Sequence, residues 1–338
     1  TMSAVGTALG PSLGGVLIAG SGWRAIFLVN VPLGILAVAL AYRHLPADRP
    51  APTTERAGFD HVGTLLLALT LAAYALAMTI GRGSFGTLNL ALLAAAALGG
   101  GLFMLAQARA ASPLIRLALF RDPLLRASLA TSALVATVMM ATLVVGPFYL
   151  SHTLGLDPAL VGAVMAIGPI ISALSGVPAG RIVDRLGAPS MVTVGLVAMA
   201  AGSMALSVLP AMFGSAGYIA AITILTPGYQ LFQAANNTAV MTDVHPAQRG
   251  VVSGLLNLSR NLGLITGASV MGAVFALASA TTDVTTASPA AVATGMRTTF
   301  AVAAALIVGA LGLALGAYLR VRRDPDHHAT DSCPPAAR

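Results

Sequence analysis

Residues 127–151 read ASLATSALVATVMMATLVVGPFYLS, a run without a charged side chain. With a rise of about 1.5 Å per residue, a helix of this length crosses the roughly 30 Å hydrocarbon core of a bilayer. Similar runs, bounded by charge, proline and glycine, recur along the whole sequence. We therefore predict an all-α integral membrane protein of about ten spans, at 1–20, 25–42, 60–81, 87–107, 127–151, 158–179, 189–209, 216–241, 253–279 and 298–319. The runs are long and unbroken, which excludes the short alternating strands of a β-barrel.

The composition indicates the same class. Hydrophobic residues make up 57% of the 338 residues and charged residues only 9%, whereas a soluble domain carries about 25% charged residues. The 18 basic residues are all arginine and are scattered between apolar runs, which does not give the basic stripe of a nucleic-acid site. The single cysteine, Cys333, excludes a disulfide framework and a cysteine-based zinc cluster. No span carries a nucleophile–base set, so we expect no enzyme, metal site or cofactor.

The arginines orient the predicted spans. One set of loops carries fourteen of them: Arg43, Arg49, Arg56, Arg109, Arg116, Arg121, Arg126, Arg181, Arg185, Arg249, Arg320, Arg322, Arg323 and Arg338. The opposite loops carry Arg24, Arg82 and Arg297. Because cytoplasmic loops are enriched in basic residues, we expect the first set and both ends of the chain to be cytoplasmic, in a multi-pass protein of the inner cell membrane.

The first predicted span contains a specific string of small residues, Gly6-Thr-Ala-Leu-Gly10-Pro11-Ser-Leu-Gly14-Gly15. Small residues four apart allow close contact between helices, and a proline bends the segment. At every glycine and proline position this string resembles the antiporter motif of the major facilitator superfamily. The following run, from Trp23 to Gly34, resembles the fifth-to-sixth helix junction of the fourteen-spanner drug:proton antiporters (QacA/EmrB-like).

A second motif, Gly180-Arg-Ile-Val-Asp184-Arg185-Leu-Gly187, lies on a predicted cytoplasmic loop. It resembles the loop motif G-x-x-x-D-R-x-G of the same superfamily, without the basic residues that usually follow its last glycine. A charged turn can lock neighbouring helix ends in one conformation and release them in another. We expect either such a gate, formed by Gly180, Asp184, Arg185 and Gly187, or an ordinary positively charged loop.

The resemblance implies a domain layout. Residues 1–42 would be the last two helices of an N-terminal bundle whose first four helices are missing. Residues 43–107 would be a cytoplasmic linker and a two-helix insert, and 108–126 a cytoplasmic loop with an amphipathic stretch. Residues 127–320 would be a complete six-helix C-terminal bundle, and 321–338 a tail. The glycine spacing of the first span recurs at Gly263, Gly267 and Gly272, as the parallel half-repeats of such transporters predict.

Polar residues inside spans are candidates for a substrate pathway, because they are costly in hydrocarbon and usually face a cavity. The candidates share one face on each of two spans: Tyr229, Gln233, Asn236 and Asn237 on one, and Asn257, Arg260 and Asn261 on the other. They either form a polar wall of the cavity or only hold helices together. All eleven acids lie in loops, in the tail or at span ends, so either the proton-coupling site lies in the missing helices or the protein is not proton-driven.

The resemblance therefore implies a transporter that exports amphipathic drugs or other small molecules by alternating access, with protons as the coupling ion. Its partners would be the small-molecule substrate, protons and the lipid bilayer, with no nucleic acid. Two alternatives stay open: a facilitator or uptake carrier of the same fold, and a truncated or degenerate membrane protein that does not transport.

Overall fold

The computed structural model describes residues 24–44, 60–80, 86–110, 112–242, 244–245, 248–280 and 287–323. The regular structure in these residues is helical, and eight helices are long and apolar enough to cross a membrane. They are α2 (Arg24–His44), α3 (His61–Thr79), α4 (Thr87–Arg109), α5 (Pro123–Phe148), α6 (Pro158–Leu186), α7 (Ala188–Thr242), α8 (Arg249–Ala278) and α9 (Pro289–Arg323). The prediction of an all-helical membrane protein is thereby confirmed, while the first predicted span, 1–20, lies outside the described residues.

Helix α7 is a hairpin of two arms. Its 55 residues would extend for about 80 Å if they were straight. The chain reverses at Gly214, which has φ 56° and ψ −131°, a conformation that glycine adopts without steric cost. A Cβ atom on Gly195 would lie 2.7 Å from the Phe232 nitrogen, and one on Gly202 would lie 2.7 Å from the Leu225 nitrogen. The arms are therefore antiparallel and in backbone contact, and they correspond to the spans predicted at 189–209 and 216–241.

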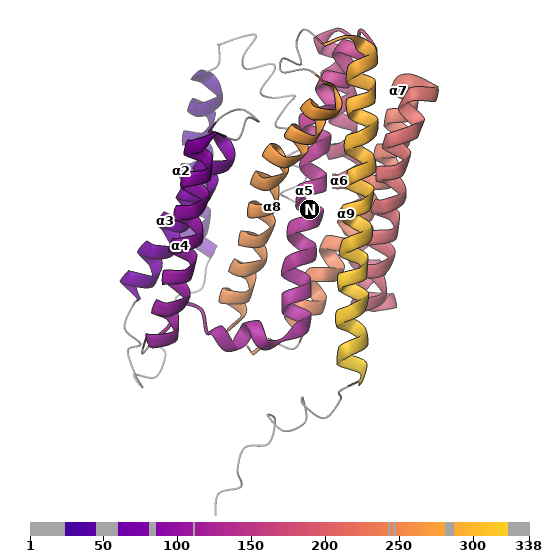
Figure 1. Ribbon diagram of the computed structural model, residues 1–338. Helices are drawn as coiled ribbons and strands as arrows, with labels where there is room; N and C mark the ends of the chain where they lie inside the picture. The colour runs from indigo at the N-terminus through magenta and orange to yellow at the C-terminus, as the bar shows by residue number, and fades with distance from the viewer. Residues whose placement is uncertain are drawn as a thin grey trace, which may run out of the picture.

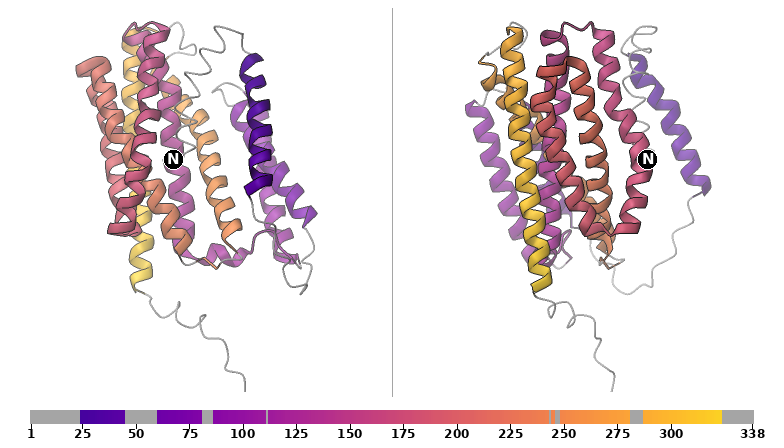
Figure 2. Two further views of the ribbon diagram at one scale, coloured as in Figure 1. Left: turned by 180° about the vertical axis from the view of Figure 1, so that it is seen from behind. Right: turned by 90° about the vertical axis from the view of Figure 1, so that its right-hand side faces the viewer.

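Helices α5 to α9 form one bundle around a common apolar core (Figure 1). Val135, Leu196, Phe232, Met271 and Phe300 are fully or almost fully buried in it. Helices α3 and α4 lie side by side on the far side of α8 from α9 (Figure 1), and α2 lies apart from this pair, as the right-hand view of Figure 2 shows. The predicted domain bounds at 42, 107, 126 and 320 stay a prediction.

Helix α3 is hydrogen-bonded to α8. The hydroxyls of Tyr74 and Thr266 contact each other, and the Ser269 hydroxyl donates to the Met78 carbonyl. These two bonds attach the α3–α4 pair to the C-terminal bundle.

The α3–α4 pair is closed by a polar network, the Asp60 clasp, at its loop end. The Asp60 carboxylate accepts a hydrogen bond from the Gly63 nitrogen at 2.7 Å and one from the Gln107 side-chain amide at 2.6 Å. The Gln107 carbonyl in turn accepts from the Ile115 nitrogen at 3.0 Å. These hydrogen bonds hold the pKa of Asp60 below its ordinary value. The clasp therefore joins the start of α3, the end of α4 and the loop that leads to α5.

The loop before α5 is partly helical. Its amphipathic stretch contains the short 3₁₀ helix η1 (Leu117–Arg121). Ile115 is buried there against Phe103 of α4 and Leu255 of α8. Helix α5 then begins at Pro123, four residues before the predicted span, and a π-helical turn η2 (Tyr149–Thr153) follows it.

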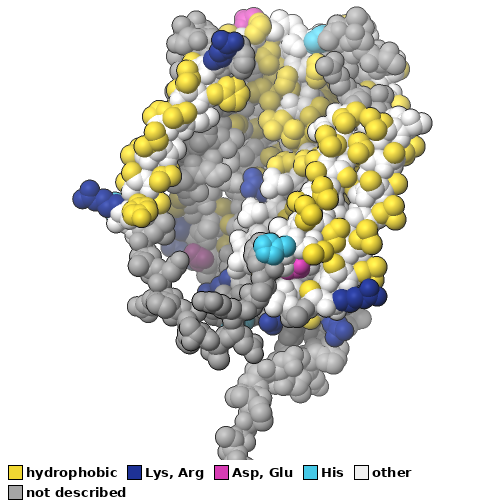
Figure 3. Space-filling model, turned by 90° about the vertical axis from the view of Figure 1, so that its left-hand side faces the viewer, with side chains coloured by type: hydrophobic (Ala, Val, Ile, Leu, Met, Phe, Trp, Pro, Cys, Tyr) yellow, Lys and Arg dark blue, Asp and Glu magenta, His cyan; other side chains and the backbone are white. Residues whose placement is uncertain are grey.

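The outer surface of the helices is apolar. On the face in Figure 3, hydrophobic side chains cover the helices between their two ends. Leu98 on α4 and Met204 on α7 have exposed fractions of 70% and 52%. Such surfaces suit a hydrocarbon environment, where all backbone polar groups must be satisfied within the helices.

Candidate functional site

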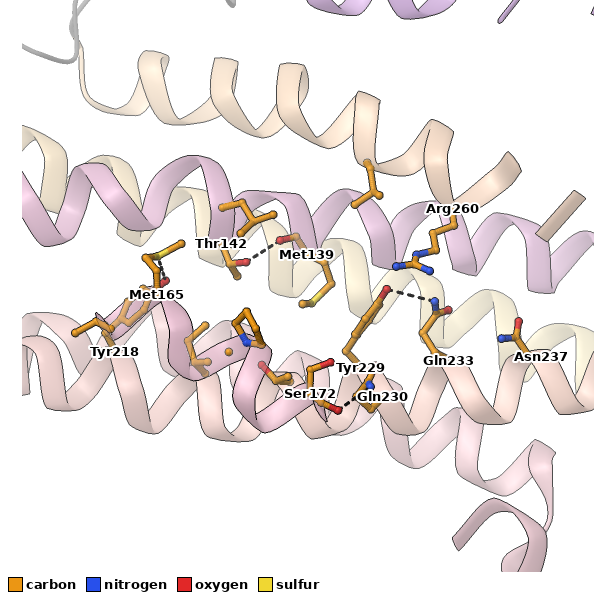
Figure 4. Close-up of a pocket in the computed structure, with 17 residues that line it drawn as sticks. Met139, Thr142, Met165, Ser172, Tyr218, Tyr229, Gln230, Gln233, Asn237 and Arg260 are labelled. Carbon is orange, nitrogen blue, oxygen red and sulfur yellow. Dashed lines mark hydrogen bonds between the residues drawn. The ribbon is translucent and has the colours of Figure 1, made fainter. Parts of the chain in front are cut away.

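The C-terminal bundle contains a cavity of about 550 Å³, here called the central cavity, between α5, α6, the second arm of α7 and α8 (Figure 4). Met165 and Tyr218 lie at one end of it, and Gln233, Asn237 and Arg260 lie at the other. Its described lining consists of Met139, Thr142, Leu143, Val164, Met165, Gly168, Pro169, Ser172, Tyr218, Ile222, Thr226, Tyr229, Gln230, Gln233, Asn237, Arg260 and Leu264. The cavity is thus amphipathic along its length.

The second arm of α7 supplies the polar wall of the cavity. Tyr229, Gln233 and Asn237 follow one another at intervals of four residues, which places them on one face of the helix. The Gln233 amide donates a hydrogen bond to the Tyr229 hydroxyl at 3.3 Å. The Gln230 amide donates to the Ser172 carbonyl at 3.0 Å, which joins α7 to α6 across the floor of the cavity.

Arg260 is the charged member among the described residues that line the central cavity. It lies on the fourth turn of α8, about 16 Å along the axis from the start of that helix at 1.5 Å per residue. Its Nε atom is buried and has no hydrogen-bond partner. The guanidinium points between Tyr229 and Gln233 (Figure 4).

A smaller cavity of about 220 Å³ adjoins the central one, because Gln233, Asn237 and Arg260 line both. Ser253 and Asn257 of α8 complete its polar wall. The structure therefore brings together five of the seven residues predicted for the substrate pathway: Tyr229, Gln233, Asn237, Asn257 and Arg260.

The other two predicted residues lie elsewhere. Asn236 is buried and donates to the Ser128 carbonyl of α5 at 3.5 Å. It lines a separate cavity of about 550 Å³, at the end of the bundle where α6 meets α7. Asn261 is exposed and donates to the Asn257 carbonyl at 2.9 Å, within its own helix. Consecutive residues on a helix are about 100° apart, so Asn236 and Asn237 cannot both face the central cavity.

The predicted gating loop is mostly helical. Gly180, Asp184 and Arg185 belong to the last two turns of α6, and the helix ends only at Gly187, with φ 86°. The prediction that Gly180, Asp184 and Arg185 lie on a loop was wrong. No proline follows Pro178 within α6, and the helix continues to Leu186. Asp184 and Gly187 line the same cavity as Asn236.

The glycines and the proline of the antiporter-type string, Gly6, Gly10, Pro11, Gly14 and Gly15, lie outside the described residues. The residues that repeat this glycine spacing on α8, Gly263 and Gly267 among them, lie within the described part of the chain. A Cβ atom on Gly263 would lie 2.3 Å from the Ala133 carbonyl oxygen of α5, and one on Gly267 would lie 2.5 Å from the Thr137 carbonyl oxygen. The Thr137 hydroxyl also donates to the Gly263 carbonyl at 3.0 Å. These glycines allow α8 to approach α5.

The described acidic residues all lie at helix ends. Asp60, Asp122 and Asp157 are the N-caps of α3, α5 and α6, and each side chain accepts a backbone hydrogen bond. Asp184 lies in the last turn of α6. In the part of the chain that the structure describes, no carboxylate lies in the middle of a span.

Several cavity residues were not predicted. Tyr218, Ile222 and Thr226 continue the Tyr229 face toward the start of the arm at intervals of three or four residues. The spacing can be read from the sequence, but the face mixes apolar and polar side chains, so it does not stand out as a polar face. Thr142 and Ser172 had no such signal, because isolated hydroxyls are common in membrane helices and usually bond to their own backbone.

A sequence profile described as Major Facilitator Superfamily matches residues 1–268. The chain is 32% identical to the uncharacterized transporter YebQ of Escherichia coli, over 79% of this chain and 58% of that protein. It is 34% identical to the drug efflux pump JefA of Mycobacterium tuberculosis, over 80% of this chain and 53% of that protein. It is 29% identical to the riboflavin transporter RibZ of Clostridioides difficile, over 80% of this chain and 58% of that protein.

The chain thus spans about half the length of the curated relatives it matches. Among solved structures, the nucleoside transporter NupG matches 93% of this chain and 88% of its own, with a TM-score of 0.53 and 18% identity. At this identity the likeness concerns the fold alone.

Proposed function

We propose, because this chain belongs to the major facilitator superfamily, that it exports amphipathic small molecules across the cell membrane in exchange for protons. The observation that carries the proposal is the central cavity, which combines an apolar end with the polar wall of α7 and Arg260. Its volume of about 550 Å³ is within the range of roughly 300–1,000 Å³ that suits a drug-sized ligand. The similar proteins named as efflux pumps, JefA and LfrA, support export as the direction.

The proposed orientation places the arginine-rich end of the bundle in the cytoplasm. Among the described residues, nine arginines lie at the end where α5 and α8 begin: Arg43, Arg109, Arg116, Arg121, Arg126, Arg181, Arg185, Arg249 and Arg320. Two, Arg24 and Arg297, lie toward the other end. The positive-inside rule supports this orientation, and with it the proposal that both ends of the chain are cytoplasmic.

We further place the chain in the fourteen-helix drug:proton antiporter branch. The glycine–proline string at residues 6–15 supports this, and so does the α3–α4 pair, which would be the extra pair of that branch. Helices α5 to α9, with two arms in α7, would form the C-terminal bundle, which rocks against an N-terminal bundle. The α6–α7 turn with Asp184, Arg185 and Gly187 would gate its cytoplasmic end.

The proton-coupling group is proposed to lie outside the described residues. A coupling carboxylate must titrate within the membrane, and the described acids are used as helix caps or lie at a helix end. The described part of the chain would accordingly supply the substrate site.

Dye transport in cells that carry the natural gene tests the proposed function. An exporter lowers the accumulation of a hydrophobic fluorescent dye, an uptake carrier raises it, and a non-transporting protein leaves it unchanged. We expect lowered accumulation, which returns toward the level of cells without the gene when Gln233→Ala alters the cavity wall. Met204→Ala, on the exposed side of α7, is the matched control and should keep the activity at equal expression.

A protonophore that abolishes the export would support proton coupling. Accumulation that rises in cells with the gene, or that is unaffected by Gln233→Ala, would contradict the proposed direction or the proposed site.

A further inference from the structure

The charge in the central cavity has no described counterion. Arg260 contributes a full positive charge, and its neighbours in both adjoining cavities are neutral side chains, including Tyr229, Gln233 and Asn257. The described carboxylates lie at the ends of α3, α5 and α6 and do not line either cavity. Within the described residues the cavity is therefore electropositive.

The Arg260 side chain also has unused hydrogen-bonding capacity. Its Nε atom is buried without a partner, and a buried donor left unpaired is costly in a membrane interior. A guanidinium offers five donors in a fixed fork, which matches the two oxygens of a carboxylate or the oxygens of a sulfonate. An anionic group beside Arg260 would satisfy the charge and the donors together.

The rest of the cavity fits the apolar part of the same molecule. Met139, Met165 and Tyr218 lie away from Arg260, toward the opposite end (Figure 4). Methionine side chains are flexible and polarisable, and they adapt to apolar groups of different shape. One end of the cavity thus suits an anion and the other an aromatic or aliphatic body.

We propose that the central cavity selects amphipathic anions, with the anionic group at Arg260 and the apolar body beside Met165 and Tyr218. This inference rests on the proposed function, since it names the substrate class of the same site. A cation in this position would be repelled by Arg260 and would leave its Nε donor unpaired.

Three probes with one skeleton separate charge from hydrophobicity: pyrenebutyrate, neutral pyrenebutanol and a pyrenebutyl-trimethylammonium cation. Binding is measured by equilibrium dialysis to the full chain in nanodiscs of zwitterionic lipid, with empty nanodiscs subtracted. We expect the anion to bind at least about tenfold more tightly than the cation, since a hydrogen-bonded charge contributes at least this ratio.

Variants assign the preference to one side chain. Arg260→Gln should remove the preference for the anion and leave the affinity for the neutral alcohol within about twofold. Arg260→Lys, which keeps the charge, should retain part of the preference. Arg109→Gln, an exposed arginine at the end of α4, should change nothing.

Any of four results would overturn the inference, and the first two concern the role of the charge. One is equal or tighter binding of the cation to the unaltered chain, and the other is an anion preference that persists in Arg260→Gln. Binding of the alcohol without any anion preference would refute the substrate class and leave the proposed site standing. Failure of all three probes to exceed empty nanodiscs would refute the site as well.

Discussion

Replacing Gly263 by alanine should destabilise the bundle, because α5 and α8 are in backbone contact there. The added Cβ would lie 2.3 Å from the Ala133 carbonyl oxygen and 2.8 Å from the Ala136 Cβ. An ordinary carbon–oxygen contact is about 3.3 Å, so the two helices must separate locally by about 1 Å. The separation would also lengthen the 3.0 Å hydrogen bond from Thr137 to the Gly263 carbonyl.

The magnitude follows from these contacts. Overpacking of this kind costs about 1–3 kcal/mol, and weakening one hydrogen bond adds up to about 1 kcal/mol. Replacing glycine by alanine in a helix returns about 1 kcal/mol through helix propensity. We expect a net loss of up to about 3 kcal/mol in the free energy of unfolding, measured by titration of the purified chain with a denaturing detergent.

Gly254→Ala on the same helix is the matched control. A Cβ atom there has no other atom within 4 Å, so the variant gains propensity without a clash and should be as stable as the unaltered chain or slightly more stable. If Gly263→Ala and Gly254→Ala have equal free energies of unfolding, the close approach of α5 and α8 does not exist as described.

Three further outcomes are expected. Hydrogen bonds lower the pKa of Asp60 in the folded chain, so its carboxylate stabilises the fold above the pKa of the unfolded chain, and this contribution is lost as pH falls through the folded pKa. Asp60→Asn should therefore be less stable than the unaltered chain near pH 7. In thermal unfolding curves at pH 3–7 the variant should also lack the part of the pH dependence that comes from Asp60. Asn237→Ala should lower dye export. Asn236→Ala, which loses the hydrogen bond to the Ser128 carbonyl of α5, should instead lower thermal stability, and the reverse pattern would show that the two faces are misassigned. Single cysteines at Ser84 and Ser112, in a background without the native cysteine, should react with an impermeant thiol reagent from outside and inside respectively, and labelling from one side only would contradict the orientation.

The helices could largely be predicted from the sequence, because an apolar run of sufficient length has one stable form in hydrocarbon. The predicted helix bounds differ from the structure at residues whose conformation depends on contacts with distant parts of the chain. The helix end after Pro178 is an example, since the polar residues Asp184 and Arg185 continue α6 where the sequence indicated a loop.

The candidate site could be predicted only in part. Periodicity identifies the polar face of α7, but it cannot distinguish Asn236 from Asn237, because the packing of α5 against α7 decides which one faces the cavity. The same holds for Tyr74 and Thr266, which meet although they are 192 residues apart. No local pattern contains that information.

The attachment of α3 to α8 has a mechanical consequence. The bonds from Tyr74 to Thr266 and from Ser269 to Met78 cross between the two helices, and the Asp60 clasp fastens α4 to α3. Any displacement of α8 that preserves these bonds must carry α3 and α4 with it. In a transporter whose bundles rock against each other, the α3–α4 pair would then move as one rigid body with the C-terminal bundle. The relative motion would occur between α2 and α3. A distance measured between labels on α4 and α8 would stay constant through the transport cycle, while one between α2 and α4 would change.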